Sequence, residues 1–349
     1  MQLRVAIAGL GYFSQFHLAS WQKIPETCVA GVFDADAARI AEIARKADVP
    51  GFASLKDMLT ALDPDILDIV TPPPTHAAFI EEAARPGLTI ICQKPFCTSL
   101  AEARRTVMLA KERGAVLVIH ENIRFQPWYR AIAEILASGT IGQVYQAHFR
   151  LRPGDGQGKD AYLARQPAFR TMPRLLVHET GVHFIDLFRW LFGEITHVYS
   201  DCRKLNPVIA GEDAGLVILN HANGVTTIFD GNRLSDHIAE NHRKTLGEMT
   251  MEGSAGTIRL DGYGRVFVRK SGSNEESEIR FDYVDEGFGG GCVEALNRHV
   301  VKHLLHGTPL ENQAEDYLPV ISVAEKAYLS WEQGRKLETG AVHDGQCQI

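Results

Sequence analysis

The sequence predicts an α/β protein that begins with a doubly wound parallel sheet of the Rossmann type. An α+β domain with a large, mostly antiparallel open sheet is expected to follow. Short apolar runs alternate with helical patterns in the first third of the chain, glycines follow the first apolar run directly, and strand-like runs dominate the remainder. Because 349 residues exceed the usual single core, we expect two domains, residues 1–123 and 124–349.

The chain opens on a buried strand and a turn that suits a dinucleotide. The apolar run from Val5 to Ala8 has no polar alternation, as expected for a strand covered on both faces. Gly9 and Gly11 follow at once. Such glycines allow the tight turn and the close approach of the pyrophosphate, which rests on the amino end of the next helix. Ser14 takes the third fingerprint position and is still small enough for close packing.

A second apolar run, from Cys28 to Phe33, ends in Asp34. Its offset from the glycines is close to the ~20 residues at which an acid meets the adenosine ribose. A 2′-phosphate would bring like charges together there, and Asp36 adds to the repulsion, so NAD is predicted over NADP. Arg39 could reach such a phosphate, but on an alanine-rich helix it is interpreted as solvated. A glycine turn in another strand-turn-helix unit is the alternative for this stretch.

Strand and helix patterns keep alternating through the first domain. Helices are expected at about 35–47, 54–62, 75–84 and 100–113, and strands at 66–70, 88–92 and 115–120. Ligands of a doubly wound sheet bind at the carboxyl ends of its strands. The segments that should therefore meet are Gly9 to Ser14, Asp34, Thr71 to His76, Gln93 to Pro95, and Glu121 with Asn122.

The second domain is predicted to begin with a linking helix at 124–138. Strands are expected at about 142–151, 195–203, 214–220, 225–231, 248–252, 257–260 and 265–269. Turns such as Asn223-Gly224 indicate mostly antiparallel pairing. Two last helices, near 291–306 and 314–333, are expected to pack back on the first domain.

One helix among these strands carries acid and base side chains. Glu179, His183 and Asp186 fall at i, i+4 and i+7, which is one narrow face of an α-helix. A solvated polar face with a helical Glu-His pair is the plain alternative. His178 and His183 are not spaced to share a helix face, so no metal site is predicted.

The preceding segment, from Arg152 to Arg174, is rich in glycine and polar residues. It could form a lid or one wall of a substrate pocket. The side chains of Tyr162, Arg165, Gln166 and Arg170 could either donate hydrogen bonds to substrate hydroxyls or only tie down a surface loop.

Composition excludes several classes of protein. A net charge of -7 without a basic block argues against a nucleic-acid partner. No apolar segment approaches the length of a membrane span, and no export signal precedes the first strand. The six cysteines show no metal-binding spacing, so reduced thiols and a cytoplasmic location are expected.

Several motifs, in this order, resemble the Gfo/Idh/MocA oxidoreductases. They are Gly9-Leu-Gly11 with His17, Thr71-Pro72-Pro73 with His76, Gln93-Lys94-Pro95, Arg124-Phe125-x-Pro127 and Gly139-x-Ile-Gly142. The resemblance covers nearly the whole chain. It implies an NAD-dependent dehydrogenase of a sugar or polyol whose open sheet forms a homodimer or homotetramer. Most relatives have glutamate where Gln93 stands, and aspartate where Glu179 stands.

The resemblance also implies roles for individual residues. Lys94 would donate to the reacting oxygen, His183 would act as general base, and Glu179 would orient it. The cofactor-binding residues would be Gly9, Gly11, Tyr12, Phe13, Ser14, Asp34, Thr71, Pro72, Pro73, His76, Gln93, Lys94 and Asn122. The substrate-binding residues would be Lys94, Arg124, Tyr162, Arg170, Glu179 and His183.

The run from His120 to Trp128 resembles the branch of this family that acts on aldopentoses such as D-apiose. It implies oxidation at the anomeric carbon to a lactone. An inositol dehydrogenase needs the same base and donor. An NAD-dependent glycoside hydrolase with no net redox is a further alternative. A cofactor-binding sensor without catalysis is expected to lack Lys94 and His183, and both are present.

Overall fold

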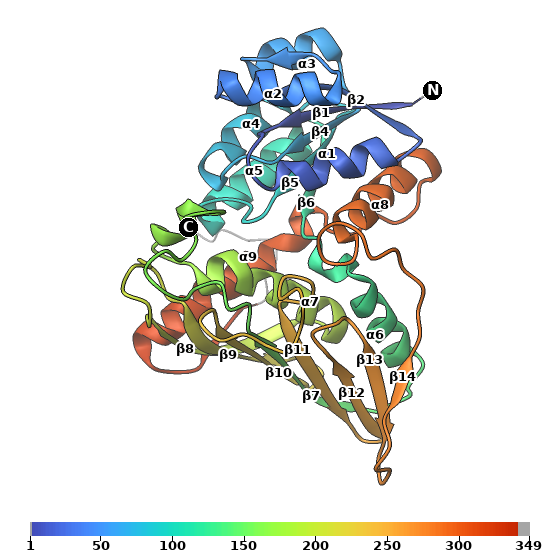
Figure 1. Ribbon diagram of the computed structural model, residues 1–349, viewed down its shortest axis with the longest axis vertical. Coiled ribbons are helices and arrows are strands. Elements are labelled where there is room, and N and C mark those ends of the chain that lie inside the picture. The colour runs from blue at the N-terminus through green and yellow to red at the C-terminus, as the bar shows by residue number, and fades with distance from the viewer. Residues whose placement is uncertain (1, 341–349) are drawn as a thin grey trace, which may run out of the picture. The chain divides into compact units, whose positions relative to one another are not determined.

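The computed structural model describes residues 2–340, and the chain divides into two compact units (Figure 1). The first unit contains the chain up to Asn122 together with Gly291–Leu318. The second contains Ile123–Gly290 and the chain from Pro319. The first unit is therefore built from two separate stretches of sequence.

The first unit contains a parallel sheet with the strand order β3-β2-β1-β4-β5-β6 among the described residues. This is the order of dinucleotide-binding Rossmann folds, and it confirms the predicted fold class. The strands are β1 (Leu3–Ala8), β2 (Thr27–Phe33), β3 (Gly51–Phe52), β4 (Ile66–Ile69), β5 (Thr89–Gln93) and β6 (Val116–His120). Val5 to Ala8 are fully buried, as their unbroken apolar run requires.

Helices cover this sheet, and side chains cap the first turns of three of them. They are α1 (Ser14–Lys23), α2 (Ala37–Ala47), α3 (Leu55–Leu62), α4 (His76–Ala83), α5 (Leu100–Glu112) and α8 (Cys292–His306). Asp36, Ser54 and Ser99 accept backbone N–H groups at the starts of α2, α3 and α5. The start of α1 has no side-chain cap. The helix α8 packs against α1, where Asn297 Nδ2 donates to Ser20 Oγ at 2.9 Å.

The second unit contains a sheet with the order β14-β13-β12-β11-β7-β10-β9-β8-β15. Only β7 and β10 pair in parallel within the described part of the chain, so the prediction of a mostly antiparallel sheet is confirmed. The strands are β7 (Val144–Leu151), β8 (Ile195–Arg203), β9 (Ala214–His221), β10 (Thr226–Asn232), β11 (Gly247–Gly253), β12 (Gly256–Leu260), β13 (Val266–Lys270), β14 (Ser277–Ile279) and β15 (Leu337–Glu338).

Figure 1 shows α6 (Pro127–Ala137) and α7 (Val182–Phe192) over the same face of this sheet. Aromatic rings make the contact of α7. The Phe184 ring stacks on Phe149 of β7 with centroids 3.8 Å apart, and lies 5.4 Å from Phe229 of β10. The long helix α9 (Ala314–Gln333) contains Pro319, at which the division between the units falls.

The short elements escape prediction. The strands β3, β14 and β15 are two or three residues long and carry no periodic pattern.

No helix within residues 2–340 has the length and apolar character needed to cross a membrane. Five cysteines of the described range are free thiols, and Cys347 lies outside that range.

Candidate active site

The segments after β1, β2 and β4 meet through backbone contacts. The Gly9 N–H donates to Phe33 O at 2.8 Å, and the Val70 N–H donates to Ala8 O at 2.7 Å. The Leu10 N–H donates to Asp34 Oδ2 at 2.6 Å. These bonds place the glycine turn beside the ends of both neighbouring strands, where ligands of this architecture bind.

The two glycines of the turn are required for different reasons. Gly9 has φ +100°, and a Cβ there would lie 2.7 Å from the Val70 carbonyl carbon, so the fold itself requires glycine. A Cβ on Gly11 would meet nothing within 4 Å. No described protein atom lies close enough to require glycine at position 11. A pyrophosphate that approaches the backbone there would require it. The uncapped start of α1 nearby offers N–H groups to such an anion, so the turn fits a dinucleotide.

Asp34 follows β2 with both carboxylate oxygens engaged. Besides the Leu10 bond, Asp34 Oδ1 accepts the Asp36 N–H at 2.9 Å. Asp36 accepts the Ala38 N–H at 2.9 Å and caps α2. These bonds leave further lone pairs on Asp34 for a ribose diol and keep two acids where a 2′-phosphate would lie. Tyr12 and Phe13 lie in the same turn, and Tyr12 is exposed.

His76 connects the turn after β4 to the segment after Lys94. Its imidazole nitrogens lie 2.7 Å from Thr71 O and 2.7 Å from Phe96 O. Burial lowers the pKa of His76, although both carbonyls favour the protonated ring. Pro72 and Pro73 start the short 3₁₀ turn Pro73–Thr75, which precedes α4. The predicted helix at 75–84 thus has its regular part at His76–Ala83.

Gln93 and Lys94 lie at the carboxyl end of β5. The Lys94 N–H donates to Gln93 Oε1 at 2.8 Å, and Gln93 Nε2 lies 3.0 Å from His17 Nε2. The Gln93 side chain is therefore directed at α1, and Lys94 is half-buried.

Asn122 follows β6 and is 2% exposed. Its Nδ2 has no hydrogen-bond partner among the residues described. A buried amide donor left unpaired is costly. The carboxamide oxygen of a nicotinamide would supply the acceptor that this group needs.

The predicted helix face with Glu179, His183 and Asp186 is wrong in its geometry. Leu176–Gly181 forms a π-helical turn, and the α-helix begins only at Val182. The spacing of 100° per residue therefore does not extend back to Glu179. His183 and Asp186 lie on α7 and are buried, at 7% and 1% exposed, so this helix does not turn a solvated face outward.

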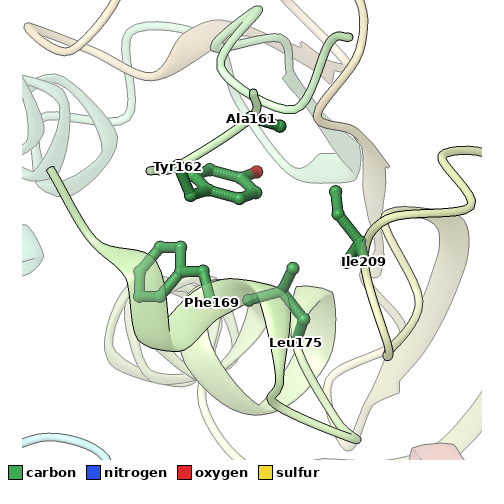
Figure 2. Packing of buried hydrophobic residues seen from close by; sticks show 5 residues of the cluster. All are labelled: Ala161, Tyr162, Phe169, Leu175 and Ile209. Carbon is green, nitrogen blue, oxygen red and sulfur yellow. The ribbon is translucent and has the colours of Figure 1, made fainter. Parts of the chain in front are cut away.

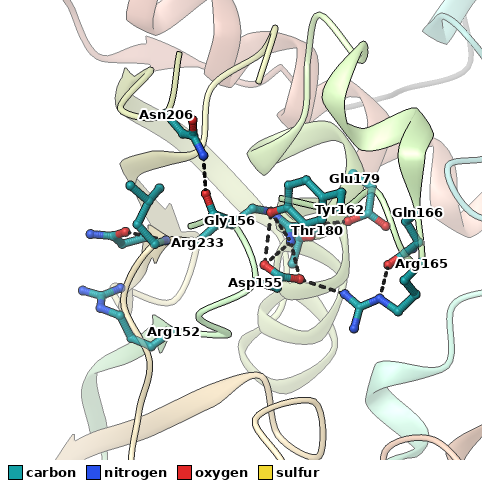
Figure 3. A network of polar contacts seen from close by, with 12 residues as sticks. Arg152, Asp155, Gly156, Tyr162, Arg165, Gln166, Glu179, Thr180, Asn206 and Arg233 are labelled. Atoms are coloured by element: carbon teal, nitrogen blue, oxygen red, sulfur yellow. Dashed lines mark hydrogen bonds and ion pairs between the residues drawn. The ribbon is translucent and has the colours of Figure 1, made fainter. Parts of the chain in front are cut away.

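Glu179 belongs to a charged network around Arg233 (Figure 3). Arg233 Nη2 lies 2.8 Å from Glu179 Oε2 and also donates to Thr180 Oγ1. Its Nη1 lies 3.3 Å from Asp155 Oδ1. Burial opposes the charge, but Asp155, Tyr162 and Glu179 outweigh it and raise the pKa of Arg233.

The segment from Arg152 to Arg174 is tied down by the same network. Tyr162 Oη donates to Asp155 Oδ1 at 3.1 Å, and Arg165 Nη2 lies 3.0 Å from Asp155 Oδ2. The Arg165 Nε donates to Gln166 Oε1 at 3.1 Å. These contacts agree with the alternative in which Tyr162, Arg165 and Gln166 only tie down a surface loop. Arg170 is half-buried, and its carbonyl accepts the Ala210 N–H at 2.8 Å.

An apolar cluster supports this segment from within the second unit (Figure 2). It contains Ala161, Tyr162, Phe169, Leu175 and Ile209. The Tyr162 ring lies edge-on to Phe169 with centroids 5.2 Å apart. Tyr162 therefore packs its ring in the cluster while its hydroxyl stays in the network, and burial raises the pKa of that hydroxyl.

Arg124 forms an ion pair with Asp186. Its guanidinium donates through Nε at 2.8 Å and through Nη2 to the two Asp186 oxygens. This bidentate pair joins the short turn Ile123–Phe125 to α7. It gives Arg124 a structural role that the sequence does not predict.

Sequence reasoning missed Arg233, Asp155 and Glu212. Glu212 is 3% exposed and accepts the Leu175 and Val177 N–H groups at 3.2 Å and 3.1 Å, where the π-helix starts. The available signal is the acidic pair Glu212-Asp213 directly before a strand, since buried acids there must accept nearby N–H groups. Within residues 2–340, no three His, Cys, Asp or Glu side chains group closely enough to hold a metal ion.

The fold and the cofactor turn define an NAD-binding oxidoreductase with a Rossmann domain and a second sheet domain. Residues 3–121 match the model described as oxidoreductase family, NAD-binding Rossmann fold, and residues 129–259 match the GFO/IDH/MocA C-terminal domain. The chain belongs to the GFO/IDH/MocA oxidoreductase family, as its motifs predict.

Named relatives match along nearly the whole chain. The D-apiose dehydrogenase of Paraburkholderia graminis is 31% identical over 340 residues, covering 95% of this chain and 88% of that protein. The D-apiose dehydrogenase of Rhizobium rhizogenes is 27% identical and covers 98% and 99%. The crystal structure of an oxidoreductase from Agrobacterium radiobacter, in complex with NAD+, L-tartaric acid and magnesium, matches with a TM-score of 0.88. It is 25% identical, covering 97% of this chain and 99% of that one.

Proposed function

We propose that this enzyme oxidises an aldopentose such as D-apiose to its lactone with NAD+. The observation that supports this choice of substrate is the similarity to D-apiose dehydrogenases over 95% of the chain. The presence of both Lys94 and His183 supports catalysis, because removal of a hydride from a carbinol requires a base for the hydroxyl proton and a donor for the oxygen.

In this mechanism each residue acts on a defined atom. His183 takes the proton of the reacting hydroxyl through a ring nitrogen, and Lys94 donates to the same oxygen and stabilises the developing alkoxide. NAD+, when bound, would supply the acceptor for the hydride that leaves the carbon. Glu179, fixed by Arg233 and Thr180, holds a negative charge that orients His183 or a substrate hydroxyl. Arg170 remains a proposed substrate contact, and Arg124 and Tyr162 would contact the substrate while keeping their bonds to Asp186 and Asp155.

The turn residues would hold the cofactor. Gly9, Gly11, Tyr12, Phe13 and Ser14 would receive the pyrophosphate, and Asp34 the adenosine ribose. Thr71, Pro72, Pro73 and His76 would form the wall after β4, with Gln93, Lys94 and Asn122 at the nicotinamide end. We expect kcat/KM to be higher with NAD+ than with NADP+; equal values would contradict the role of Asp34.

Substitution of the two proposed catalytic side chains tests the mechanism. Lys94→Met and His183→Ala should each lower kcat by roughly 10²-fold or more, while the Kd for NAD+ stays close to wild type. The matched controls are Lys56→Met and His306→Ala, which remove exposed residues of the same kinds. Wild-type turnover in His183→Ala would show that the helix has only a structural role.

A substrate panel separates the remaining alternatives. Pentoses, hexoses, inositols and hydroxy acids are each incubated with NAD+, and NADH is measured by its absorbance. A preference for an inositol would favour an inositol dehydrogenase. Glycoside cleavage without stoichiometric NADH would favour the hydrolase. One NADH for each lactone formed supports the proposal.

We also infer a homodimer or homotetramer located in the cytoplasm. Ile218 of β9 is paired with Ile228 of β10, and the neighbouring Leu216 is 39% exposed, which puts apolar side chains on one face of the sheet. Free thiols such as Cys92 and Cys202 suit a reducing compartment. Light scattering of the wild type and of Ile228→Glu tests the assembly, since a buried interface charge should give monomers.

A further inference from the structure

Gln93 lies in the middle of a buried hydrogen-bonded chain that ends at Lys94. Asp68 Oδ2 lies 2.7 Å from His17 Nδ1, and His17 Nε2 lies 3.0 Å from Gln93 Nε2. Gln93 Oε1 accepts the Lys94 N–H at 2.8 Å. His17 and Asp68 are fully buried and Gln93 is 7% exposed, so water does not replace these bonds.

Only one placement of the hydrogens satisfies this chain. A backbone N–H is always a donor, so the atom of Gln93 that faces Lys94 must be the amide oxygen. The NH₂ group of Gln93 then faces His17, whose Nε2 must be the acceptor. The ring proton therefore lies on Nδ1 and is donated to Asp68.

Two neighbouring contacts agree with a neutral His17. The His120 ring lies against it, with centroids 4.1 Å apart and planes tilted by 39°, and a charged imidazolium in that position would be close to a second titratable ring. Trp21 Nε1 also donates to Asp68 Oδ2, at 2.7 Å. The Asp68 carboxylate thus receives a second donor that does not depend on the charge of His17.

A glutamate at position 93 would change the protonation of this hydrogen-bonded chain of side chains and not its geometry. One carboxylate oxygen could still accept the Lys94 N–H. The other would face His17 Nε2, where two acceptors cannot bond, so a further proton would have to be bound, either by the ring or by the carboxyl group. The amide of Gln93 lets His17 stay neutral while Lys94 is held, and it needs no added proton.

We propose that Gln93 is a positioning residue, which fixes the Lys94 backbone by anchoring it to a neutral, Nδ1-protonated His17. This inference rests on the proposed catalytic role of Lys94. Because His17 lies on α1, one turn beyond the glycine loop, the chain joins the cofactor-binding helix to the lysine through directional bonds.

Nitrogen NMR of histidine tests the proposal without reference to activity. The full-length protein with NAD+ is labelled with ¹⁵N-histidine, and a His17→Asn spectrum identifies the His17 signals. We expect one protonated nitrogen, Nδ1, in the wild type. The Nε2-protonated form or an imidazolium in the wild type would overturn the assignment.

Kinetics test the positioning of Lys94. We expect kcat to fall roughly tenfold or more in Gln93→Met, which removes the acceptor of the Lys94 N–H, with the Kd for NAD+ within about twofold of wild type. Gln22→Met is the matched control, because it makes the same change on the exposed side of α1. Gln93→Leu serves if Gln93→Met does not fold, and it should show the same loss of kcat.

Unchanged kcat in Gln93→Met or Gln93→Leu would overturn the positioning role. Failure of the proposed function is separately visible. Wild-type turnover in Lys94→Met would remove the catalytic role of the lysine, while the NMR result for His17 would still stand or fall by itself.

Discussion

The two units each contain a buried polar network, but the networks are built from different chemistry. The chain through His17 in the first unit contains a carboxylate, an imidazole and an amide. The network around Arg233 in the second unit contains full charges of both signs, with Asp155 and Glu179 as the acids. Both are shielded from solvent, since His17 is fully buried and Arg233 is 4% exposed.

This difference separates two uses of buried polar groups. An amide or imidazole bonds correctly in only one arrangement of hydrogens, so the first chain fixes direction. A guanidinium donates along several directions and a carboxylate accepts along several, so the second network holds chain segments together by charge. We therefore expect changes in the chain through His17 to affect activity most, and changes in the network around Arg233 to affect stability most.

The largest effect on stability is expected from Arg233→Met. Removal of the guanidinium takes away the cation that pairs with Glu179 and leaves Asp155 paired with Arg165, which should cost about 3–5 kcal/mol in the free energy of unfolding. Urea unfolding followed by tryptophan fluorescence measures this loss, because Trp128, Trp190 and Trp331 all lie in the second unit.

Two further variants sharpen this prediction. Adding Glu179→Gln to Arg233→Met should recover part of the loss, since it neutralises the acid that has lost the Arg233 cation while Asp155 stays paired with Arg165. Arg150→Met is the control, because Arg150 is exposed and its pair with Glu248 spans 3.6 Å; its cost should stay below about 1 kcal/mol. A loss that small in Arg233→Met would refute the structural role of the network.

Smaller effects are expected at the two glycines of the turn. Substitution of Gly9 should lower the stability of the fold, and substitution of Gly11 should weaken cofactor binding. Gly9→Ala should lower stability by about 1–3 kcal/mol, because of its positive φ and the 2.7 Å approach to Val70. Gly11→Ala should leave stability unchanged or raise it by up to about 1 kcal/mol, but weaken NAD+ binding roughly tenfold. Unfolding and NAD+ titration are measured on both. Normal NAD+ affinity in Gly11→Ala would mean that this turn does not hold the pyrophosphate.

Local patterns in the sequence predict most of the fold. The strand at Ile195–Arg203 has the predicted bounds, and Gly9, Asp34 and Thr71 lie at strand ends as their positions require. These features depend on neighbours in the sequence, on apolar runs and on glycine. The strand order follows from the alternation of strands with helices.

The second unit could not be predicted in the same way. The π-helix at Leu176–Gly181 starts where Glu212, 37 residues after Leu175, binds two backbone N–H groups. Arg233 meets Glu179 across 54 residues. Such contacts leave no periodic pattern in the sequence. The sequence therefore predicts a regular α-helix, and the helix face predicted for Glu179 is wrong.

The smallest predicted effect concerns acid, and each unit contains one histidine that tests it. Burial lowers the pKa of His76 in the first unit and of His221 in the second. Their rings contact carbonyl oxygens, His76 those of Thr71 and Phe96, and His221 that of Gly193. In the unfolded chain each ring returns to its ordinary pKa of 6.5.

Below pH 6.5 the unfolded chain therefore binds protons that the folded chain does not. Stability is complete above that pH and is lost as the pH falls toward the lowered folded pKa, by up to about 1.4 kcal/mol per pH unit for each histidine. His76→Gln and His221→Gln should each make the dependence of unfolding free energy on pH shallower between pH 6.5 and 5, whereas the exposed His306→Gln should not. If His76→Gln keeps the wild-type slope, protonation of His76 is as favourable in the folded chain as in the unfolded one, because its two carbonyl acceptors then compensate for burial.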